Sequence, residues 1–426
     1  MRNSFVFGSL LSLLSFGVLG SFAACEAGSG DEDEDTVSGQ VTAGGGDTLT
    51  VGSSMGGMGP CASSPSADSD MDGFTGAEGD CNDCDPNVNP GAIEVVVDPS
   101  STGGGGMAPP PADEDCDGMV DNPPTATCDM GLALDSSMAL DGAKAIELCQ
   151  QAAGPKDWGV INATYVRANG TPATPNTQYG ILSNFGPNVP PQAGANMLGL
   201  SSGAARIPGQ PGACGTCSCG TNGPGTAPPG FPQNAPGCII NPEINDDIGL
   251  EVELRAPTNA TGYSFDFKFY TFEFAEWVCT DFNDQFMALV DPAPMGAMDG
   301  NVSFDMSGNP VSVNIAFFDT CTSCANWAEN CTQGCPPAPS MCCPAGAAEM
   351  QGTGFDVWTG TFDNGEAGGT AWLRTTVPVD GGSTFKIRFA IWDTGDNLLD
   401  ATSVVDNFQW IATGGSVSVG TIPVPE

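Results

Sequence analysis

The sequence predicts a mainly β protein. We expect an antiparallel, jelly-roll-like β-sandwich with one helix near its start, preceded by a small loop module stapled by disulfides and calcium. Three observations support this. Apolar residues alternate with a period of two in several segments, which is typical of half-buried strands. The chain holds 59 glycines and 35 prolines, which predict many turns and few helices. Aspartates and cysteines crowd together near the N-terminus, in loops with little apolar sequence.

Residues 1–24 have the features of a signal peptide. Arg2 supplies the positive start, and Phe5–Val18 is an apolar run of suitable length. The sequence Phe22-Ala-Ala-Cys25 then resembles the lipobox of bacterial lipoproteins, which implies that Cys25 is lipidated. Glu26 follows, a residue that favours the outer membrane or cell surface over inner-membrane retention. The alternative is ordinary cleavage and release of a secreted protein.

The next segment, residues 25–60, is predicted to be a disordered linker. It is rich in glycine, serine, threonine and acids, including the run Asp31–Asp35. Such a composition cannot bury enough apolar surface to fold. A flexible tether would hold a lipid-anchored domain away from its membrane.

Residues 61–128 are predicted to form a calcium-binding loop module. In the stretch 68–73, aspartates occupy positions 1, 3 and 5 of a loop and glycine occupies position 6, a pattern that wraps oxygen ligands around a hard cation. The loop differs from an EF-hand, because Gly79 stands where the bidentate glutamate is expected. Asp80 is the better candidate to close the shell. Calcium suits these all-oxygen donors, and the alternative is a solvated acidic linker. The candidate ligands in this first part are Asp68, Asp70, Asp72, Asp80, Asp83 and Asp85.

This stretch resembles the metal-binding motif of bacterial surface proteins, which itself looks like thrombospondin type 3 calcium repeats. The resemblance covers roughly residues 61–122, with a Gly/Pro-rich insert at 100–111. It implies that Asp68, Asp70, Asp72 and the Phe74 carbonyl bind one ion, and that Cys81 pairs with Cys116. By the same resemblance Asp113, Asp115 and Asp117 complete this site or form a second one. The matching residues continue as Asp85-Pro86, Asn89-Pro-Gly-Ala92, Glu94 and 113–122.

Residues 129–412 are predicted to form the sandwich. A helix is expected at Leu140–Ala152, with Asp141 as its cap. The strands that follow should each have one solvent-facing and one buried side. The apolar phase changes after Phe269, which predicts a bulge or bend near Tyr270. The alternating positions are Leu250, Val252 and Leu254; Tyr263, Phe265, Phe267 and Phe269; Val311, Val313, Ile315 and Phe317; Phe385, Ile387, Phe389 and Ile391; and Val404, Phe408 and Trp410.

This second region resembles the choice-of-anchor L domain of bacterial surface proteins. The matching segments are 263–270, 274–279, 282–286, 391–400 and 405–408. The resemblance implies an extracellular β-domain and no transferable catalytic activity. Residues 413–426 are left as a tail.

A second group of oxygen donors lies in the turns of the predicted sandwich. If the sheets bring these turns together, they provide a possible second calcium site. The alternative is that the side chains cap strand ends through Asx-turns. The candidates are Asp281, Asn283, Asp284, Asp393, Asp396 and Asp400.

The composition excludes several functions. The formal net charge is −41, so the chain would repel nucleic-acid phosphates. There is no histidine, which removes Ser-His-Asp and Cys-His catalysis and His-ligated zinc. A carboxylate pair such as Glu273 and Glu276 leaves a glycosidase hypothesis open.

The 18 cysteines also bear on the compartment. In an exported chain they predict structural disulfides, with zinc or redox sites as the alternative for the C-x-x-C pairs. If Cys25 carries lipid, an odd number remains, which predicts one thiol outside the intramolecular disulfides.

Together these features predict a non-enzymatic, calcium-binding, extracytoplasmic surface lipoprotein. Its partners would be a membrane, through the lipid, and a cell-surface polysaccharide or protein. The alternatives are a calcium-dependent adhesin or glycan-binding protein and, less favoured, an extracellular hydrolase.

Overall fold

The computed structural model describes residues 65–95, 111–122, 128–174, 176–219, 223–315, 317–356, 366–412 and 416–425. The chain divides into two compact units after Met58, and every feature below belongs to the second. The predicted signal peptide, Cys25, the linker 25–60 and most of the insert at 100–111 lie outside the described residues. Within the described part, no helix is long and apolar enough to cross a bilayer.

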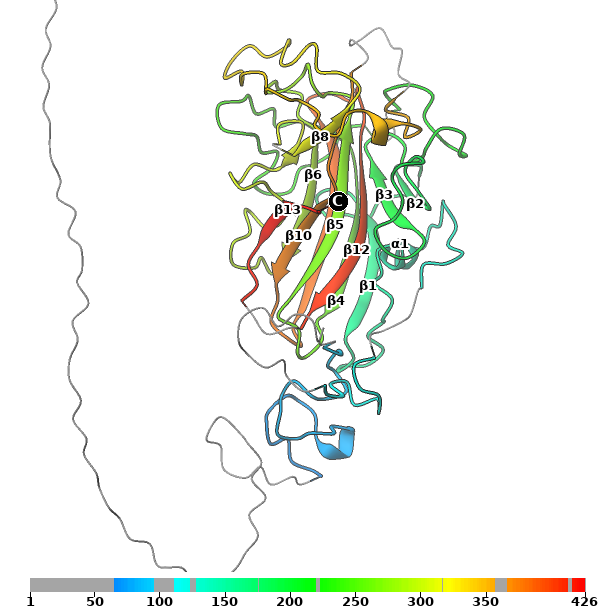
Figure 1. Cartoon of the computed structure of the whole chain (residues 1–426), viewed down its shortest axis with the longest axis vertical. Coiled ribbons are helices and arrows are strands. Elements are labelled where there is room, and N and C mark those ends of the chain that lie inside the picture. Colours follow the sequence, from blue (N-terminus) through cyan, green and yellow to red (C-terminus); the bar gives the residue numbers. More distant parts are fainter. Residues whose placement is uncertain are drawn as a thin grey trace, which may run out of the picture. The chain divides into compact units, whose positions relative to one another are not determined.

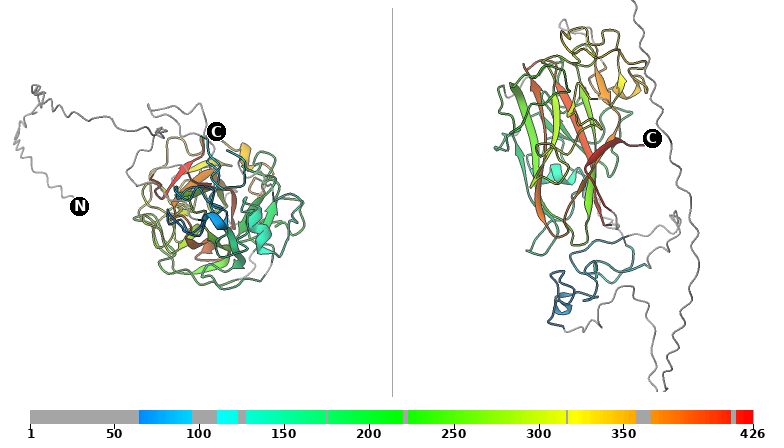
Figure 2. Two further views of the ribbon diagram at one scale, coloured as in Figure 1. Left: turned by 90° about the horizontal axis from the view of Figure 1, so that it is seen from below. Right: turned by 90° about the vertical axis from the view of Figure 1, so that its left-hand side faces the viewer.

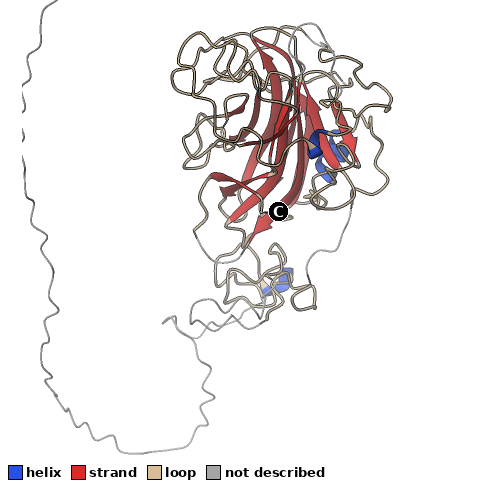
Figure 3. Cartoon of the chain, turned by 45° about the horizontal axis from the view of Figure 1, so that its top comes forward, coloured by secondary structure: helices blue, strands red, loops and turns tan. Residues whose placement is uncertain are grey.

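Strands and loops make up nearly all of the described chain, as Figure 3 shows. The mainly β prediction is therefore confirmed, and every pairing between strands is antiparallel. The strands are β1 (Gly159–Val166), β2 (Tyr179–Leu182), β3 (Met197–Ser201), β4 (Ile244–Arg255), β5 (Gly262–Thr271), β6 (Gln285–Asp291), β7 (Val311–Ser312), β8 (Phe318–Cys321), β9 (Gly368–Thr370), β10 (Leu373–Pro378), β11 (Thr384–Thr394), β12 (Ala401–Ile411) and β13 (Gly420–Pro423).

The strands form two sheets. The five-stranded sheet has the order β1-β4-β11-β6-β7, and the eight-stranded sheet runs β13-β10-β5-β12-β3-β2, with β9 pairing β5 and β8 (Figure 1). The C-terminal strand β13 pairs with β10 (Figure 2). It belongs to the segment that the sequence predicted as a tail, and it is only four residues long, which is too short to show a periodic pattern.

Aromatic side chains from the two sheets meet in one core. Phe265 of β5 lies 5.0 Å from Phe389 of β11, and Phe267 of β5 lies 4.9 Å from Phe286 of β6, measured between ring centroids. All four rings are fully buried. Burying one such side chain contributes roughly 1.5–3 kcal/mol. This shared core confirms the predicted sandwich and gives it a source of stability that is independent of any ion.

The prediction that each strand has one solvent-facing side is wrong for β5. Every residue of this strand is buried, including Asp266 and Lys268, which looked solvent-facing in the sequence. Each has an opposite charge from outside the strand: Arg374 forms a bidentate pair with Asp266, and Lys268 pairs with Glu349. Ion pairing therefore lets a central strand carry charges on a covered face.

Of the predicted bulge or bend near Tyr270, the structure has the bend: β5 continues without a bulge to Thr271, and the chain bends directly afterwards, at Phe272 and Glu273. The irregularities lie in neighbouring strands. In β4 an extra residue near Asp246, which has φ of 50°, breaks the register with β11. In β12 an extra residue near Asn407, with φ of 54°, breaks the register with β5. The predicted strand at 311–317 shrinks to β7, followed by turns and then β8.

The predicted helix exists but is shorter. Helix α1 spans Ala139–Lys144, and the chain leaves the helix before Glu147, which has φ of 67°. Asp141 is not its cap; it lies in the first turn and accepts hydrogen bonds from Ser136 and Lys144. The disulfide between Cys128 and Cys149 follows directly, so the end of the predicted helix is used as a cross-linked loop.

Disulfides cross-link the loops, as the sequence predicted. The C-x-x-C residues do not pair within their own motifs; instead Cys321 and Cys324 each bond to one member of a vicinal pair. Cys217 is a buried thiol. The disulfides are Cys81–Cys116, Cys128–Cys149, Cys214–Cys219, Cys238–Cys279, Cys321–Cys343, Cys324–Cys342 and Cys331–Cys335, and Cys84 is disulfide-bonded as well.

Glu147 makes stability depend on pH. Burial and the nearby Asp406 carboxylate raise the pKa of Glu147 from 4.5 to about 9. The folded state therefore holds a proton that the unfolded state releases above its ordinary pKa, and this stabilisation is lost as pH rises between about 4.5 and about 9. We expect Glu147→Gln to flatten the fall in melting temperature across this range. The exposed Glu243→Gln is the control, and an equally flat profile for both variants would contradict the assignment.

Candidate metal centre

The predicted calcium loop at 68–73 adopts a tight, ligand-facing turn. Its position 4, Met71, has φ of 67°, and its position 6, Gly73, has φ of 97°. Positive φ at position 6 strains any residue with a Cβ, which is why glycine stands there. The Asp68 carboxylate accepts hydrogen bonds from the backbone N–H groups of Met71 and Gly73, at 2.7 and 3.1 Å. The turn is thus closed by its own first aspartate.

The stretch 113–118 repeats this geometry. Cys116 at position 4 has φ of 57° and Gly118 at position 6 has φ of 92°. Its first aspartate, Asp113, accepts from the Gly118 N–H at 3.0 Å, as Asp68 does from Gly73. The carboxylates at positions 3 and 5 also accept the N–H two residues ahead in both loops. The two stretches are therefore two copies of one loop.

In the first loop, three carboxylates each keep one oxygen without a hydrogen-bond partner. One oxygen of Asp70, Asp72 and Asp80 accepts a backbone N–H, from residues 72, 74 and 82. The other oxygen of each is buried and receives no hydrogen bond from the described residues. Asp80 is only 7% exposed. Carboxylate oxygens held in place but unpaired are the donors that a hard cation needs.

The remaining candidates of the first part have different roles. Asp83 is buried, accepts the N–H and the hydroxyl of Ser69, and lies in one group with Asp70 and Asp80, whose ligand atoms are within 4.8 Å of one another. Asp85 accepts two hydrogen bonds from Asn87, so we assign it to a turn. The Phe74 ring is buried against Gly91, and the backbone N–H of Phe74 donates a hydrogen bond to Asp72.

The second loop forms its own cluster. Ligand atoms of Asp113 and Asp115 lie within 4.8 Å of one of Glu94, a residue of the matched motif that was not among the predicted ligands. One Glu94 oxygen accepts the Asp115 N–H, and the other is buried without a partner among the described residues. Asp117 accepts from Met119 and Asn122 at the edge of the loop. Of the two predicted possibilities, the arrangement favours a second site.

The raised pKa values of these carboxylates indicate that ionising them without a cation is unfavourable. Burial, followed by repulsion from Asp70 and Asp80, raises the pKa of Asp72 to about 6. Burial and neighbouring carboxylates also raise the pKa of Asp70 and of Asp115. A divalent ion between them would reverse this effect, because it favours the ionised form of each ligand.

The loops are tied to each other and to the sandwich. The Cys81–Cys116 disulfide, which the resemblance implied, joins the two copies. Asn259, in the turn between β4 and β5, both donates to and accepts from the Ile93 backbone, at 2.8 and 3.0 Å. Lys156 donates to the Gly73 carbonyl and to Glu78, both at 2.6 Å. The module is therefore anchored beside its glycine turn and beside Glu94.

The predicted second site separates into buried and half-buried residues. Asp284, Asp393 and Asp400 are buried at one end of the sandwich. Asp281 and Asp396 are only half-buried. Asn283 is buried but engaged with the Gln233 carbonyl and the Asn314 amide. Asp284, Asp393 and Asp400 are therefore the buried members of the predicted group, while Asp281 and Asp396 lie at its edge, where their charges contribute to the raised pKa of Glu273.

The glutamate pair of the glycosidase hypothesis is not placed for catalysis. Glu273 and Glu276 are each 1% exposed. The Glu273 carboxylate accepts the N–H of Asp284 inside the protein. A glycosidase needs two carboxyls that face the sugar, so this pair gives the hydrolase hypothesis no support.

No protein-family model matches this chain, and no curated protein matches it. The resemblances of residues 61–122 and 129–412 therefore stay predictions, and the function is inferred from the geometry of the site.

Proposed function

We propose that this chain is a non-enzymatic, calcium-binding surface lipoprotein. Cys25 carries the lipid anchor, the linker 25–60 spans the distance from the membrane, and the loop module holds calcium ahead of a β-sandwich that presents a recognition surface. The disulfides in the loops are in keeping with export to an oxidising compartment.

One observation supports calcium binding most strongly. Both copies of the loop are closed by hydrogen bonds from their own backbone to their aspartates. Among the described residues, no donor satisfies one buried oxygen of Asp70 and of Asp72 in the first copy, or one of Glu94 beside the second. Leaving such oxygens buried and unpaired is costly, whereas a cation would use them. The donors are all hard oxygens, which favours calcium over zinc or copper.

In this proposal calcium acts as a structural staple. The module has few buried apolar residues, so its binding energy is also folding energy. At a free calcium concentration 100-fold above Kd, one site adds about 2.7 kcal/mol to the stability of the state that binds it. The ordered module then sets the distance between tether and sandwich.

Chelation tests this role. On addition of EGTA we expect the module at residues 65–122 to become sensitive to protease, while the sandwich core stays protected, because only the module depends on ions for its fold. Limited proteolysis followed by mass spectrometry locates the cuts. Magnesium at equal concentration is the control for ionic strength. Protection that is unchanged by chelation would contradict the proposal.

A further inference from the structure

Four carboxylates from both sheets meet at one end of the sandwich. Glu273 follows β5 and Asp400 precedes β12, both strands of the eight-stranded sheet. Asp393 lies in β11 and Asp284 precedes β6, both of the five-stranded sheet. The register brings them together in pairs within each sheet, since Ala401 pairs with Thr271 and Trp392 pairs with Gln285. The Asp284 N–H, which donates to the Glu273 carboxylate, connects the two pairs.

The hydrogen bonds of this cluster follow the pattern of the calcium loops. Asp284 accepts the Thr394 N–H at 3.1 Å, and Asp400 accepts the Cys219 N–H at 2.7 Å. The second oxygen of each, and both oxygens of Asp393, are buried without a hydrogen-bond partner in the part of the chain described. Asp393 is 1% exposed. In Asp284 and Asp400, a backbone amide thus holds one carboxylate oxygen in place and leaves the other able to bind a cation.

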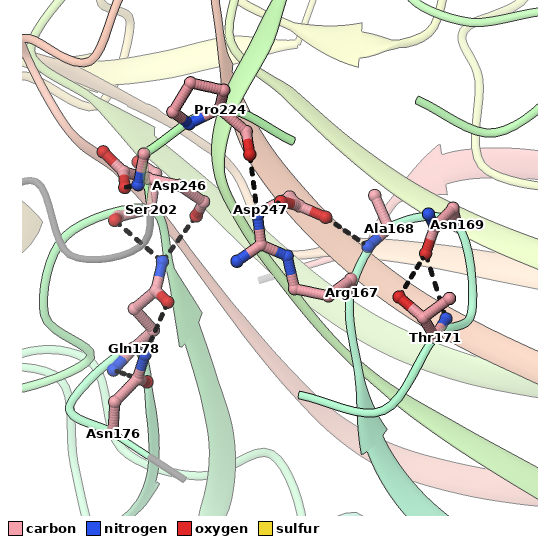
Figure 4. A network of polar contacts seen from close by, with 11 residues as sticks. Arg167, Ala168, Asn169, Thr171, Asn176, Gln178, Ser202, Pro224, Asp246 and Asp247 are labelled. Carbon is pink, nitrogen blue, oxygen red and sulfur yellow. Dashed lines mark hydrogen bonds and ion pairs between the residues drawn. The ribbon is translucent and has the colours of Figure 1, made fainter. Parts of the chain in front are cut away.

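Two other buried carboxylates in this sandwich, those of Asp247 and Asp266, are compensated by cationic side chains. Asp247, in the bulge of β4, contacts Arg167 at 2.6 Å and accepts the Ala168 N–H, while the neighbouring Asp246 directs its carbonyl to Gln178 (Figure 4). Asp266 has Arg374. Among the described ion pairs, none involves Glu273, Asp284, Asp393 or Asp400. Within the part of the chain that the structure describes, no lysine or arginine therefore compensates the charge at this end.

We propose that Asp284, Asp393 and Asp400, with Glu273 beside them, bind a divalent cation that clamps the two sheets together. Calcium is the class of ion that fits, because every donor is a carboxylate oxygen and carboxylates reach it at about 2.3–2.6 Å. The ion links the β5–β6 connection to the end of β11 and to the residue that precedes β12. This site is separate from the loop module and goes beyond the proposed function.

The competing occupant is the proton. Burial and mutual repulsion raise the pKa of Glu273, Asp284 and Asp393 well above the ordinary range, so neutral carboxylic acids could share these positions. The two occupants differ in what they predict. A cation makes stability depend on calcium, whereas protons alone make it indifferent to calcium.

The number of calcium ions bound per full-length chain distinguishes a bound cation from protonated carboxylic acids. In the variant Asp80→Asn/Asp115→Asn, which disables the loops, we expect one calcium per chain to remain after desalting, as measured by elemental analysis. Adding Asp393→Asn should remove it and abolish the calcium-dependent gain in melting temperature. Asp266→Asn, equally buried but paired with Arg374, is the control; it should lower stability without changing the calcium count.

A loop variant that holds no calcium, or holds the same calcium with and without Asp393, would overturn the inference. If the loops themselves do not bind calcium, the result differs: the wild-type chain would then bind no more calcium than the Asp80→Asn/Asp115→Asn variant. If the loop variant does not fold, hydrogen exchange on wild type is decisive. Calcium should slow exchange of the Thr394 amide, and unchanged exchange would count against the clamp.

Discussion

Replacing Asp80 with asparagine is expected to lower calcium affinity at the first loop by at least about 100-fold, since even supporting residues around a metal contribute 10–100-fold. Asparagine keeps the shape and the oxygen that accepts the Asn82 N–H at 2.8 Å. It replaces the unpaired oxygen with an amide that repels the cation. Isothermal titration with calcium measures the loss.

The variant also separates ion loss from misfolding. Without calcium, Asp80→Asn removes a repelling charge from the group that holds Asp70 and Asp83, so the metal-free module should be no less stable than wild type. Asp85→Asn is the matched control, because its carboxylate serves a turn through Asn87. Equal calcium titrations for wild type and Asp80→Asn would show that this residue is not a ligand.

Removing the Cys81–Cys116 disulfide is expected to destabilise the module by about 4 kcal/mol. The bond closes a loop with a sequence separation of 35, and the chain-entropy model gives this value for such a loop. The double variant Cys81→Ala/Cys116→Ala should therefore open the module locally while the sandwich, with its own aromatic core, keeps its melting temperature.

Hydrogen exchange across residues 65–122 measures this opening, and added calcium should reverse part of it if the ion orders both loops as proposed. The control is Cys331→Ala/Cys335→Ala, which removes a bond with a sequence separation of 4, worth about 2 kcal/mol in the same model, from a distant loop. If exchange in the module did not rise above that of this control, the cross-link would not be what holds the two copies together.

Local features of the chain could be predicted from the sequence. The spacing in 68–73 and 113–118 places donors within one turn, so the ligand pattern follows from neighbouring residues alone. The period of two likewise found β4, β5, β11 and β12. Such signals need no knowledge of tertiary contacts.

Features that depend on distant residues were missed. Glu94 joins Asp113 only because residues far apart in the sequence meet, and Asp393 lies beside Asp284 only through the register of β11 and β6. The sequence predicts that one face of β5 is exposed to solvent. The face is covered because Arg374 and Glu349, which lie far along the sequence, pair with its charges. Helix α1 stops early because Glu147 adopts a left-handed conformation, which no helical periodicity records.

The most direct test of the account is the metal content of the native chain. Elemental analysis combined with native mass spectrometry, on protein purified without chelator, counts bound calcium together with any lipid and the disulfides. We expect bound calcium in each loop that leaves with EGTA and returns on adding calcium. A protein that carries no metal, yet keeps residues 65–95 and 111–122 ordered, would contradict the proposal.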